Sequence, residues 1–283
     1  MRLKITMTDS MVDVLTELGV TVVNYGDREI SARCPFHADN HPSFSMNAET
    51  GLWICYQCGE RGTVEMLAEK IGGKPVNTTV LFREVKFKSI GKTKKLLPKV
   101  EDPTLMLARY RSFKNPPTWA LEERFIDSQV AERYGIKWDL GWVIPIWEPE
   151  FFELLGWQFK QVDFVSNYPK AVKKSLTLFG LRELESTTVV LVESPLDVAR
   201  LASAGVPAVA SYGAFVSNAQ VRLLVAAANK VILALDNDET GQAQTTKLYS
   251  YLNKFVLTKK AVFPKRCKDP GDMTDAQVME VFG

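Results

Sequence analysis

The chain has 283 residues, of which 46% are hydrophobic and 24% are charged, and its formal net charge is +2. This length and composition exclude an intrinsically disordered or fibrous protein and allow two or three folded domains. No apolar run approaches the roughly 20 residues that span a bilayer, and residues 1–5 lack the apolar stretch of a secretory signal. We therefore expect a cytoplasmic protein that has no membrane partner.

The first 73 residues contain the signals of a small folded module. Apolar residues recur at helical spacing in residues 10–19 and 64–71. Residues 44–46 and 52–56 alternate as strands do, and residues 47–51 have the composition of a turn between them. The sequence therefore predicts two helices that flank a β-hairpin.

Zinc-type ligands lie between these two helices. They form two pairs, each with two residues between its members: Cys34 with His37, and Cys55 with Cys58. That spacing is typical of a structural zinc site with four protein ligands. His41 is an alternative to His37, although only His37 has the short spacing from Cys34. Since three of the four cysteines are used in this way, we expect Cys267 to be a lone, reduced thiol.

Positive charge is concentrated in one segment of the chain. Residues 74–99 contain eight basic residues and one acid, and the segment opens at Gly72, Gly73 and Pro75 and closes near Pro98 and Pro103. This composition predicts a basic linker over residues 74–103. The linker either is a solvated tether or contacts nucleic-acid phosphates, and the candidates for such contacts are Lys92, Lys94 and Lys95.

Acidic residues follow two β-branched apolar runs in the last third of the chain. The runs, residues 187–192 and 230–235, are each followed by a helical pattern, which predicts parallel strands. Glu193 follows the first run, whereas Asp236 and Asp238 follow the second, so their carboxylates are expected to converge. With Asp269 they form the all-oxygen set that magnesium prefers. An ordinary turn or helix cap is the alternative for Asp236 and Asp238.

Two longer motifs carry a family resemblance. Residues 34–45, Cys-Pro-Phe-His-Ala-Asp-Asn-His-Pro-Ser-Phe-Ser, and residues 53–59, Trp-Ile-Cys-Tyr-Gln-Cys-Gly, resemble the zinc-binding domain of bacterial and bacteriophage DNA primases. Residues 190–197, Val-Leu-Val-Glu-Ser-Pro-Leu-Asp, and residues 231–241, Val-Ile-Leu-Ala-Leu-Asp-Asn-Asp-Glu-Thr-Gly, are similar to the Toprim fold that these primases use for catalysis. Both halves of the chain therefore resemble one family.

The resemblance implies an α+β multidomain protein. We expect a zinc ribbon, a small antiparallel sheet with helices, and after the basic linker a mixed α/β RNA polymerase core that ends in a Toprim subdomain. The expected boundaries are 1–73 for the zinc-binding domain, 74–103 for the linker, 104–183 for the amino-terminal subdomain of the core, and 184–283 for the Toprim subdomain.

The resemblance also implies roles for the acidic residues. Glu193, Asp236 and Asp238 would be catalytic and, with Asp269, would hold Mg²⁺ or Mn²⁺. The family usually has two aspartates separated by one residue in its last motif, whereas Asp272 stands three residues beyond Asp269, so we leave its part in metal binding open. Asp197 matches the family as well, and we expect it to orient its neighbours or water without binding the metal directly.

The middle region, residues 104–180, resembles in order the subdomain that precedes Toprim. Three lysines there best match the face that the family offers to template and incoming nucleotide: Lys170, Lys173 and Lys174. Five of the six tryptophans fall between residues 119 and 157. Base stacking is one use for them, and core packing is the use we predict for most of them.

The family resemblance implies a DNA primase of bacteriophage or plasmid type, which makes short RNA primers as a nucleotidyltransferase. The expected partners are a single-stranded DNA template, ribonucleoside triphosphates and, as an open case, a replicative helicase. Zn²⁺ would be structural, because protein fills all four of its coordination positions. Two other classes stay open: a Toprim nuclease or topoisomerase-like enzyme, and a single-stranded-DNA-binding replication factor without catalysis.

Overall fold

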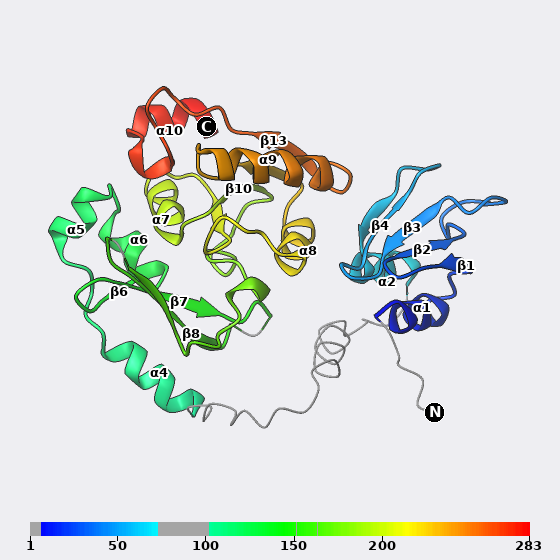
Figure 1. Ribbon diagram of the computed structural model, residues 1–283, viewed down its shortest axis with the longest axis horizontal. Coiled ribbons are helices and arrows are strands. Elements are labelled where there is room, and N and C mark those ends of the chain that lie inside the picture. Colours follow the sequence, from blue (N-terminus) through cyan, green and yellow to red (C-terminus); the bar gives the residue numbers. More distant parts are fainter. Residues whose placement is uncertain (1–6, 73–101, 151, 163) are drawn as a thin grey trace. The chain divides into compact units, whose positions relative to one another are not determined.

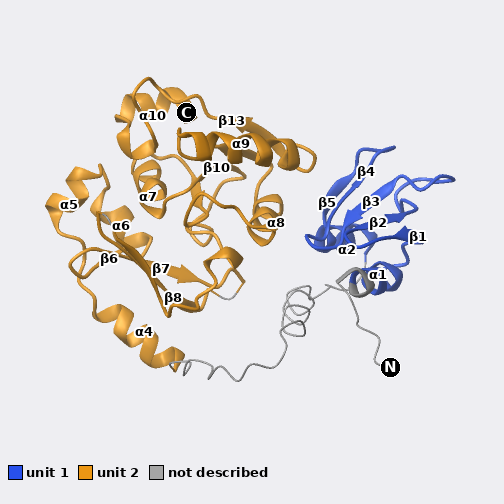
Figure 2. Ribbon diagram, in the orientation of Figure 1, with its two compact units in different colours: residues 1–96 blue, residues 97–283 orange. Residues whose placement is uncertain are grey.

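Residues 7–72, 102–150, 152–162 and 164–283 are described by the computed structural model (Figure 1). They belong to two units, residues 1–96 and residues 97–283, each with its own internal contacts (Figure 2). The division between the units falls inside the predicted linker. Residues 73–101, including Lys92, Lys94 and Lys95, lie outside the described residues. The boundary between residues 183 and 184 stays a prediction.

The first unit contains one antiparallel sheet in which strands follow their sequence order. Its elements are α1 (Met7–Glu17), β1 (Val22–Tyr25), β2 (Glu29–Ala32), β3 (Phe44–Asn47), β4 (Leu52–Cys55), β5 (Arg61–Thr63) and α2 (Val64–Ile71). The Thr63 hydroxyl accepts a bond from the backbone N–H of Met66 and so caps α2, which ends at Gly72 in the left-handed conformation. The predicted helices and hairpin are confirmed, although α1 begins three residues before residue 10.

Trp53 is the centre of the first unit's core. Its side chain is fully buried, with its ring 5.2 Å from that of Phe44 and 5.6 Å from that of Phe36. The indole Nε1 donates to the Thr63 carbonyl at 2.7 Å, which satisfies the one polar group of a buried tryptophan. This packing fixes β4, the strand that ends at Cys55.

The second unit begins with three helices and a second antiparallel sheet of order β6-β7-β8-β9. The elements are α4 (Pro103–Ser112), α5 (Thr118–Glu123), α6 (Ser128–Arg133), β6 (Lys137–Trp138), β7 (Trp142–Trp147), β8 (Leu154–Lys160) and β9 (Val165–Tyr168). Trp142 and Trp157 are buried, and the Trp138 ring lies 5.2 Å from that of Trp142. Trp119 is exposed. The prediction that most of these tryptophans pack in the core is confirmed.

A parallel sheet follows, with the order β11-β10-β12-β13. Its strands and the helices that connect them are β10 (Thr188–Val192), α7 (Pro195–Ser203), β11 (Ala208–Ala210), α8 (Asn218–Ala227), β12 (Lys230–Leu233), α9 (Glu239–Leu252), β13 (Leu257–Lys260) and α10 (Asp275–Phe282). Two 3₁₀ helices lie at Lys174–Leu176 and Pro270–Asp272. The predicted parallel sheet is confirmed.

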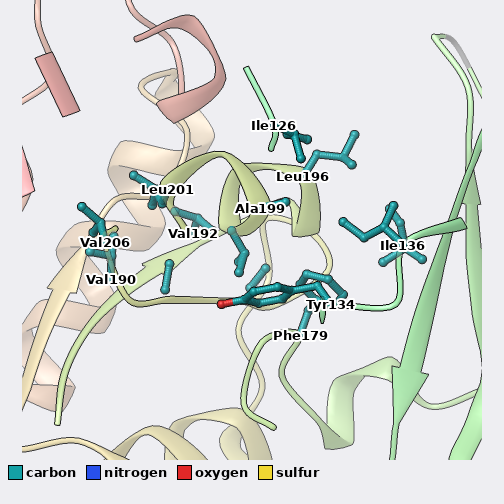
Figure 3. Close-up of a cluster of buried hydrophobic side chains, with 14 of the residues drawn as sticks. Ile126, Tyr134, Ile136, Phe179, Val190, Val192, Leu196, Ala199, Leu201 and Val206 are labelled. Carbon is teal, nitrogen blue, oxygen red and sulfur yellow. The ribbon is translucent and has the colours of Figure 1, made fainter. Parts of the chain in front are cut away.

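The two sheets of the second unit share one hydrophobic core. Ile136 and Tyr134 precede the antiparallel sheet, and they belong to the same buried cluster as Val190 and Val192 of β10 (Figure 3). Tyr212 follows β11, and its hydroxyl donates to the Pro145 carbonyl of β7 at 2.7 Å. Because the core is continuous, residues from the antiparallel part can be held in fixed positions beside the ends of the parallel strands.

The longest of the described helices, α9, has 14 residues. Among the described residues, no helix has the length and apolar character that crossing a membrane requires.

Candidate functional site

The four predicted zinc ligands come together in the first unit. One ligand atom from each of Cys34, His37, Cys55 and Cys58 lies within 4.8 Å of the others. The Cys34 and Cys58 sulfurs are 3.8 Å apart, which is the separation of about 3.8 Å expected for two sulfurs bound at about 2.3 Å to a tetrahedral zinc ion. The His37 Nε2 lies 3.3 Å from the Cys55 sulfur. The exposed His41 is not part of this cluster.

Asp39 and Ser43, which sequence reasoning missed, hold the loop that carries the ligands. The Asp39 carboxylate accepts bonds from the Cys34 backbone N–H at 2.7 Å and from the Ser43 hydroxyl at 2.8 Å. The Ser43 oxygen lies 3.2 Å from the Cys55 sulfur. Both polar residues lie between the two ligand pairs, and this position is the signal that could have identified them.

The cysteines differ in their readiness to ionise. Burial raises the pKa of the Cys34 thiol to about 12. Burial opposes ionisation of Cys55 too, but the Cys58 backbone N–H, the Ser43 hydroxyl and the His37 ring outweigh it and lower the pKa of Cys55 to about 6. The buried Cys34, the exposed Cys58, the readily ionised Cys55 and the His37 imidazole form a donor set that fits zinc, whose charge favours the thiolate form of every bound cysteine.

Carboxylates come together in the second unit at the ends of two neighbouring strands. Asp197 of α7, Asp236 after β12 and Asp269 each place an oxygen within 4.8 Å of the others. Because β10 and β12 pair in parallel, Glu193 follows β10 at the same edge of the sheet. The Glu193 Oε1 accepts a bond from the Asp236 backbone N–H at 3.2 Å.

The remaining predicted acids occupy different positions around this cluster. Asp238 is the N-cap of α9, where its Oδ1 accepts from the Gly241 N–H at 2.9 Å. This is the helix-cap position that the sequence left open as an alternative, and it is next to the cluster. Asp272 lies outside the cluster and accepts a bond from the Lys268 backbone N–H at 2.7 Å. Asp197, for which the sequence predicted an indirect part, is a member of the cluster.

Three basic side chains near the acids were not assigned a role from the sequence. Lys268 Nζ is 3.2 Å from Asp236 Oδ2 and 3.6 Å from Asp238 Oδ2. A Cβ built on Gly271 would lie 3.4 Å from Asp197 Oδ1 and 3.7 Å from Arg124 Nη1, which places Arg124 at the cluster. The positive charges of Lys160 and Arg124 both act on Asp197. Arg124 and Lys160 lie far from the acids in sequence, so no local motif indicates them.

The predicted lysines of the middle region lie in the second unit. Lys170 and Lys173 are exposed, and Lys174 is half-buried with its Nζ donating to the Tyr212 carbonyl at 2.6 Å. The next residue of that loop, Gly213, donates its N–H to the Glu193 carbonyl at 2.9 Å. Lys174 is therefore connected through two hydrogen bonds to the segment that carries Glu193.

Burial and mutual repulsion disfavour ionisation in the acidic cluster. Burial, and then the charge of Asp236, raise the pKa of Glu193 to about 7. Burial and the charge of Asp269 raise the pKa of Asp197 well above its usual range, and burial raises that of Asp269. In contrast, the Gly241 N–H lowers the pKa of Asp238. A divalent cation would relieve this repulsion, so the oxygen donor set fits Mg²⁺ or Mn²⁺.

Known protein families match segments of both units. The CHC2 zinc finger family matches residues 4–85, and the Toprim-like family matches residues 190–274. The resemblance to bacterial DNA primases is confirmed. A DNA primase of Clostridium acetobutylicum is 24% identical over 344 aligned positions, covering 99% of this chain and 57% of that protein. One of Lactococcus lactis is 34% identical over 104 residues, covering 36% of this chain and 14% of that protein.

Solved primase structures have the same fold. The zinc-binding and RNA polymerase domains of the Aquifex aeolicus primase give a TM-score of 0.54 at 22% identity, covering 95% of this chain and 80% of that one. A DnaG primase catalytic domain bound to single-stranded DNA gives 0.52 at 18% identity, covering 64% of this chain and 78% of that one. The chain spans a little over half the length of the Clostridium primase, 57%.

Replacement of a zinc ligand tests the first cluster. We predict that Cys55→Ser loses bound zinc on dialysis, because three ligands remain and the thiolate with the lowered pKa is gone. Metal content measured by mass spectrometry checks this. The matched control is Cys267→Ser, which removes a buried thiol outside the cluster and should keep its zinc. Full zinc retention in Cys55→Ser would contradict the ligand assignment.

Gly241 tests how closely α9 approaches the acidic cluster. A Cβ at Gly241 would lie 2.0 Å from the Asp236 carbonyl oxygen, so the Asp236 segment must shift in Gly241→Ala. We predict a loss of stability of about 1–3 kcal/mol, as for other overpacked sites, measured by urea denaturation. Gly26→Ala, where a Cβ meets nothing within 4 Å, should change stability far less. Equal effects of the two substitutions would contradict the close approach.

The raised pKa of Glu193 predicts how stability depends on pH in the absence of Mg²⁺ and Mn²⁺. The folded pKa of about 7 lies above the ordinary value of 4.5, so the native state binds more protons between these values. Its contribution to stability is complete below pH 4.5 and is lost as pH rises through about 7. Melting temperatures of zinc-loaded protein should therefore fall from about pH 5 to about pH 8. Glu193→Gln should reduce that slope, and an unchanged slope would contradict the shift.

Proposed function

We propose that this chain is a DNA primase, a nucleotidyltransferase that joins ribonucleotides into a short RNA primer on single-stranded DNA. The observation that carries the proposal is the acidic cluster of Asp197, Asp236 and Asp269, with Glu193 beside it, at the edge of a Toprim-like parallel sheet in a chain that also has a CHC2 zinc ribbon. The primase names of the similar proteins support the proposal.

The zinc ribbon would engage the template. Cys34, His37, Cys55 and Cys58 would hold one Zn²⁺ in a structural role, since four protein donors leave no open coordination position. The ion would stabilise the loops at the end of the sheet without taking part in the chemistry. One of the structurally similar DnaG primase domains is bound to single-stranded DNA in its solved structure, which supports the choice of template.

The acidic residues would perform the chemistry of primer synthesis. Glu193, Asp197, Asp236, Asp238 and Asp269 would hold Mg²⁺ or Mn²⁺, which when bound stabilises charge on the triphosphate and favours ionisation of the attacking 3′-hydroxyl. Asp272 would act on the backbone of the Lys268 turn, as its hydrogen bond indicates. The parallel strands hold the carboxylates in position before the substrate arrives.

Basic side chains would bind the phosphates of the nucleotide and the template. Lys174 is held by the Tyr212 carbonyl, and burial lowers the pKa of its ammonium group. The exposed Lys170 and Lys173 extend the positive charge along the same segment. Arg124 and Lys160 lie near Asp197, and Lys160 Nζ donates to the Ser194 hydroxyl oxygen at 3.3 Å. A triphosphate bound near these groups would have its charge offset by them.

The cellular setting of the proposal is bacterial replication. The chain would work in the cytoplasm of a bacterium, encoded by the cell or by a bacteriophage or plasmid, with ribonucleoside triphosphates as substrates. A replicative helicase is the protein partner that primer synthesis at a replication fork calls for.

Primer synthesis on single-stranded DNA of varied sequence tests the proposal. We predict short RNA products that depend on the template and on Mg²⁺ or Mn²⁺, and that fall by roughly 10²–10³-fold or more in Asp236→Ala. Glu239→Ala is the matched control, since it removes a negative charge from an exposed residue in the first turn of α9. Labelled ribonucleotides on a denaturing gel give the measurement.

The products also decide between the alternatives. Cleavage of the template in place of RNA synthesis would contradict the proposal and support a Toprim nuclease or topoisomerase-like enzyme. DNA binding without any RNA product would support a replication factor that has no catalysis. Equal activity of Asp236→Ala and the wild-type protein would remove Asp236 from the site.

A further inference from the structure

Lys268 is placed among the acids of the proposed metal site. Its Nζ lies 3.2 Å from Asp236 Oδ2 and 3.6 Å from Asp238 Oδ2, so one ammonium group bridges two carboxylates. Its positive charge also acts on Glu193. A cation in this position offsets the repulsion among carboxylates that the sheet holds together.

The backbone around Lys268 fixes the start of this side chain. The Lys268 N–H donates to Asp272 Oδ2 at 2.7 Å, and the Lys268 carbonyl accepts from the Asn237 N–H at 2.7 Å. The second bond ties the lysine segment to the residue between Asp236 and Asp238. The ammonium is therefore aimed at this pair by the local fold, although the side chain itself is 56% exposed and free to swing towards solvent.

Lys268 makes the two sides of the acidic cluster different. On one side, Asp197, Asp236 and Asp269 place oxygens within 4.8 Å of one another. On the other side, the Oδ2 atoms of Asp236 and Asp238 already contact the Lys268 ammonium. A divalent cation that uses the Asp236 and Asp238 oxygens must displace Lys268 or bind beside its charge. Two cations at such short separation repel, and the repulsion weakens the binding of the second.

We propose that Lys268 is a built-in counter-ion of the acidic site that competes with divalent cations for Asp236 and Asp238. The inference rests on the proposed function, because it takes these acids as metal ligands. The lysine stabilises the protein before metal binds. It also makes metal binding weaker at the Asp236–Asp238 side than at the side formed by Asp197, Asp236 and Asp269. Metal binding at the Asp236–Asp238 side is weakened by the ammonium unless the side chain withdraws, which its exposure allows.

Direct binding of Mn²⁺ tests this proposal without a measurement of activity. The zinc-loaded full chain is titrated with Mn²⁺, and electron paramagnetic resonance measures the free ion. Lys268→Gln should bind Mn²⁺ about threefold to thirtyfold more tightly than the wild-type protein, the range that removing one nearby positive charge gives. Lys268→Arg keeps the charge and should bind as the wild-type protein does.

Two further variants separate the lysine's role from general charge effects. Lys265→Gln removes an exposed positive charge three residues earlier in the same loop and should leave Mn²⁺ affinity unchanged. Asp236→Ala identifies the binding that belongs to this site. Unchanged or weaker binding in Lys268→Gln would overturn the proposal, as would an equal gain in Lys265→Gln.

Thermal melting gives the second readout. Without Mg²⁺ or Mn²⁺, zinc-loaded Lys268→Gln should melt below the wild-type protein, because its carboxylates have lost their counter-ion. Mn²⁺ should raise the melting temperature of Lys268→Gln by more than that of the wild-type protein. An equal or higher melting temperature without Mn²⁺ would overturn the proposal.

The failures of the two proposals can be told apart. If Lys268→Gln binds Mn²⁺ more tightly as expected but the wild-type protein makes no primer, only the proposed function is contradicted. If Asp236→Ala binds as much Mn²⁺ as the wild-type protein, or if neither binds it, the metal site and the role of Lys268 are both overturned.

Discussion

Repulsion among carboxylates at the end of a parallel sheet is the constraint around which the second unit is arranged. Parallel pairing of β10 with β12 brings Glu193 and Asp236 to one edge, and the packing of α7 adds Asp197. Burial makes their ionisation costly and raises the pKa of Glu193 to about 7. The site therefore needs positive charge to become fully ionised, from the protein, from a metal ion or from both.

The protein supplies part of that charge and holds the acids rigidly. Arg124 and Lys160 come from the antiparallel part of the unit, and their positions beside Asp197 depend on the shared hydrophobic core (Figure 3). Gly241 lets the first turn of α9 approach the Asp236 carbonyl, where any side chain would clash. The Asp236 segment is thus positioned by backbone contacts, and its carboxylate, which pairs with the exposed Lys268, is not needed to hold the segment in place.

Several features could be predicted from the sequence because the relevant signals are local. The spacing of Cys34 from His37 and of Cys55 from Cys58 predicted the cluster that the structure brings together. The β-branched runs before Glu193 and Asp236 likewise predicted two parallel strands. In each case a few neighbouring residues contain both the element and the chemical groups.

Other features depend on contacts between distant segments. The inclusion of Asp197 in the acidic cluster depends on how α7 packs against the sheet, which periodicity alone does not give. Arg124 reaches the site from the end of α5, more than 70 residues before Asp197. Asp272, whose part in metal binding the sequence left open, accepts a hydrogen bond from the Lys268 backbone, a contact that no local motif indicates.

The central claim is that the acidic cluster binds divalent metal, and a crystal structure with Mn²⁺ tests it most directly. Anomalous scattering should place Mn²⁺ between the oxygens of Asp197, Asp236 and Asp269. Mn²⁺ elsewhere, or no Mn²⁺ among these acids at millimolar concentration, would contradict the claim.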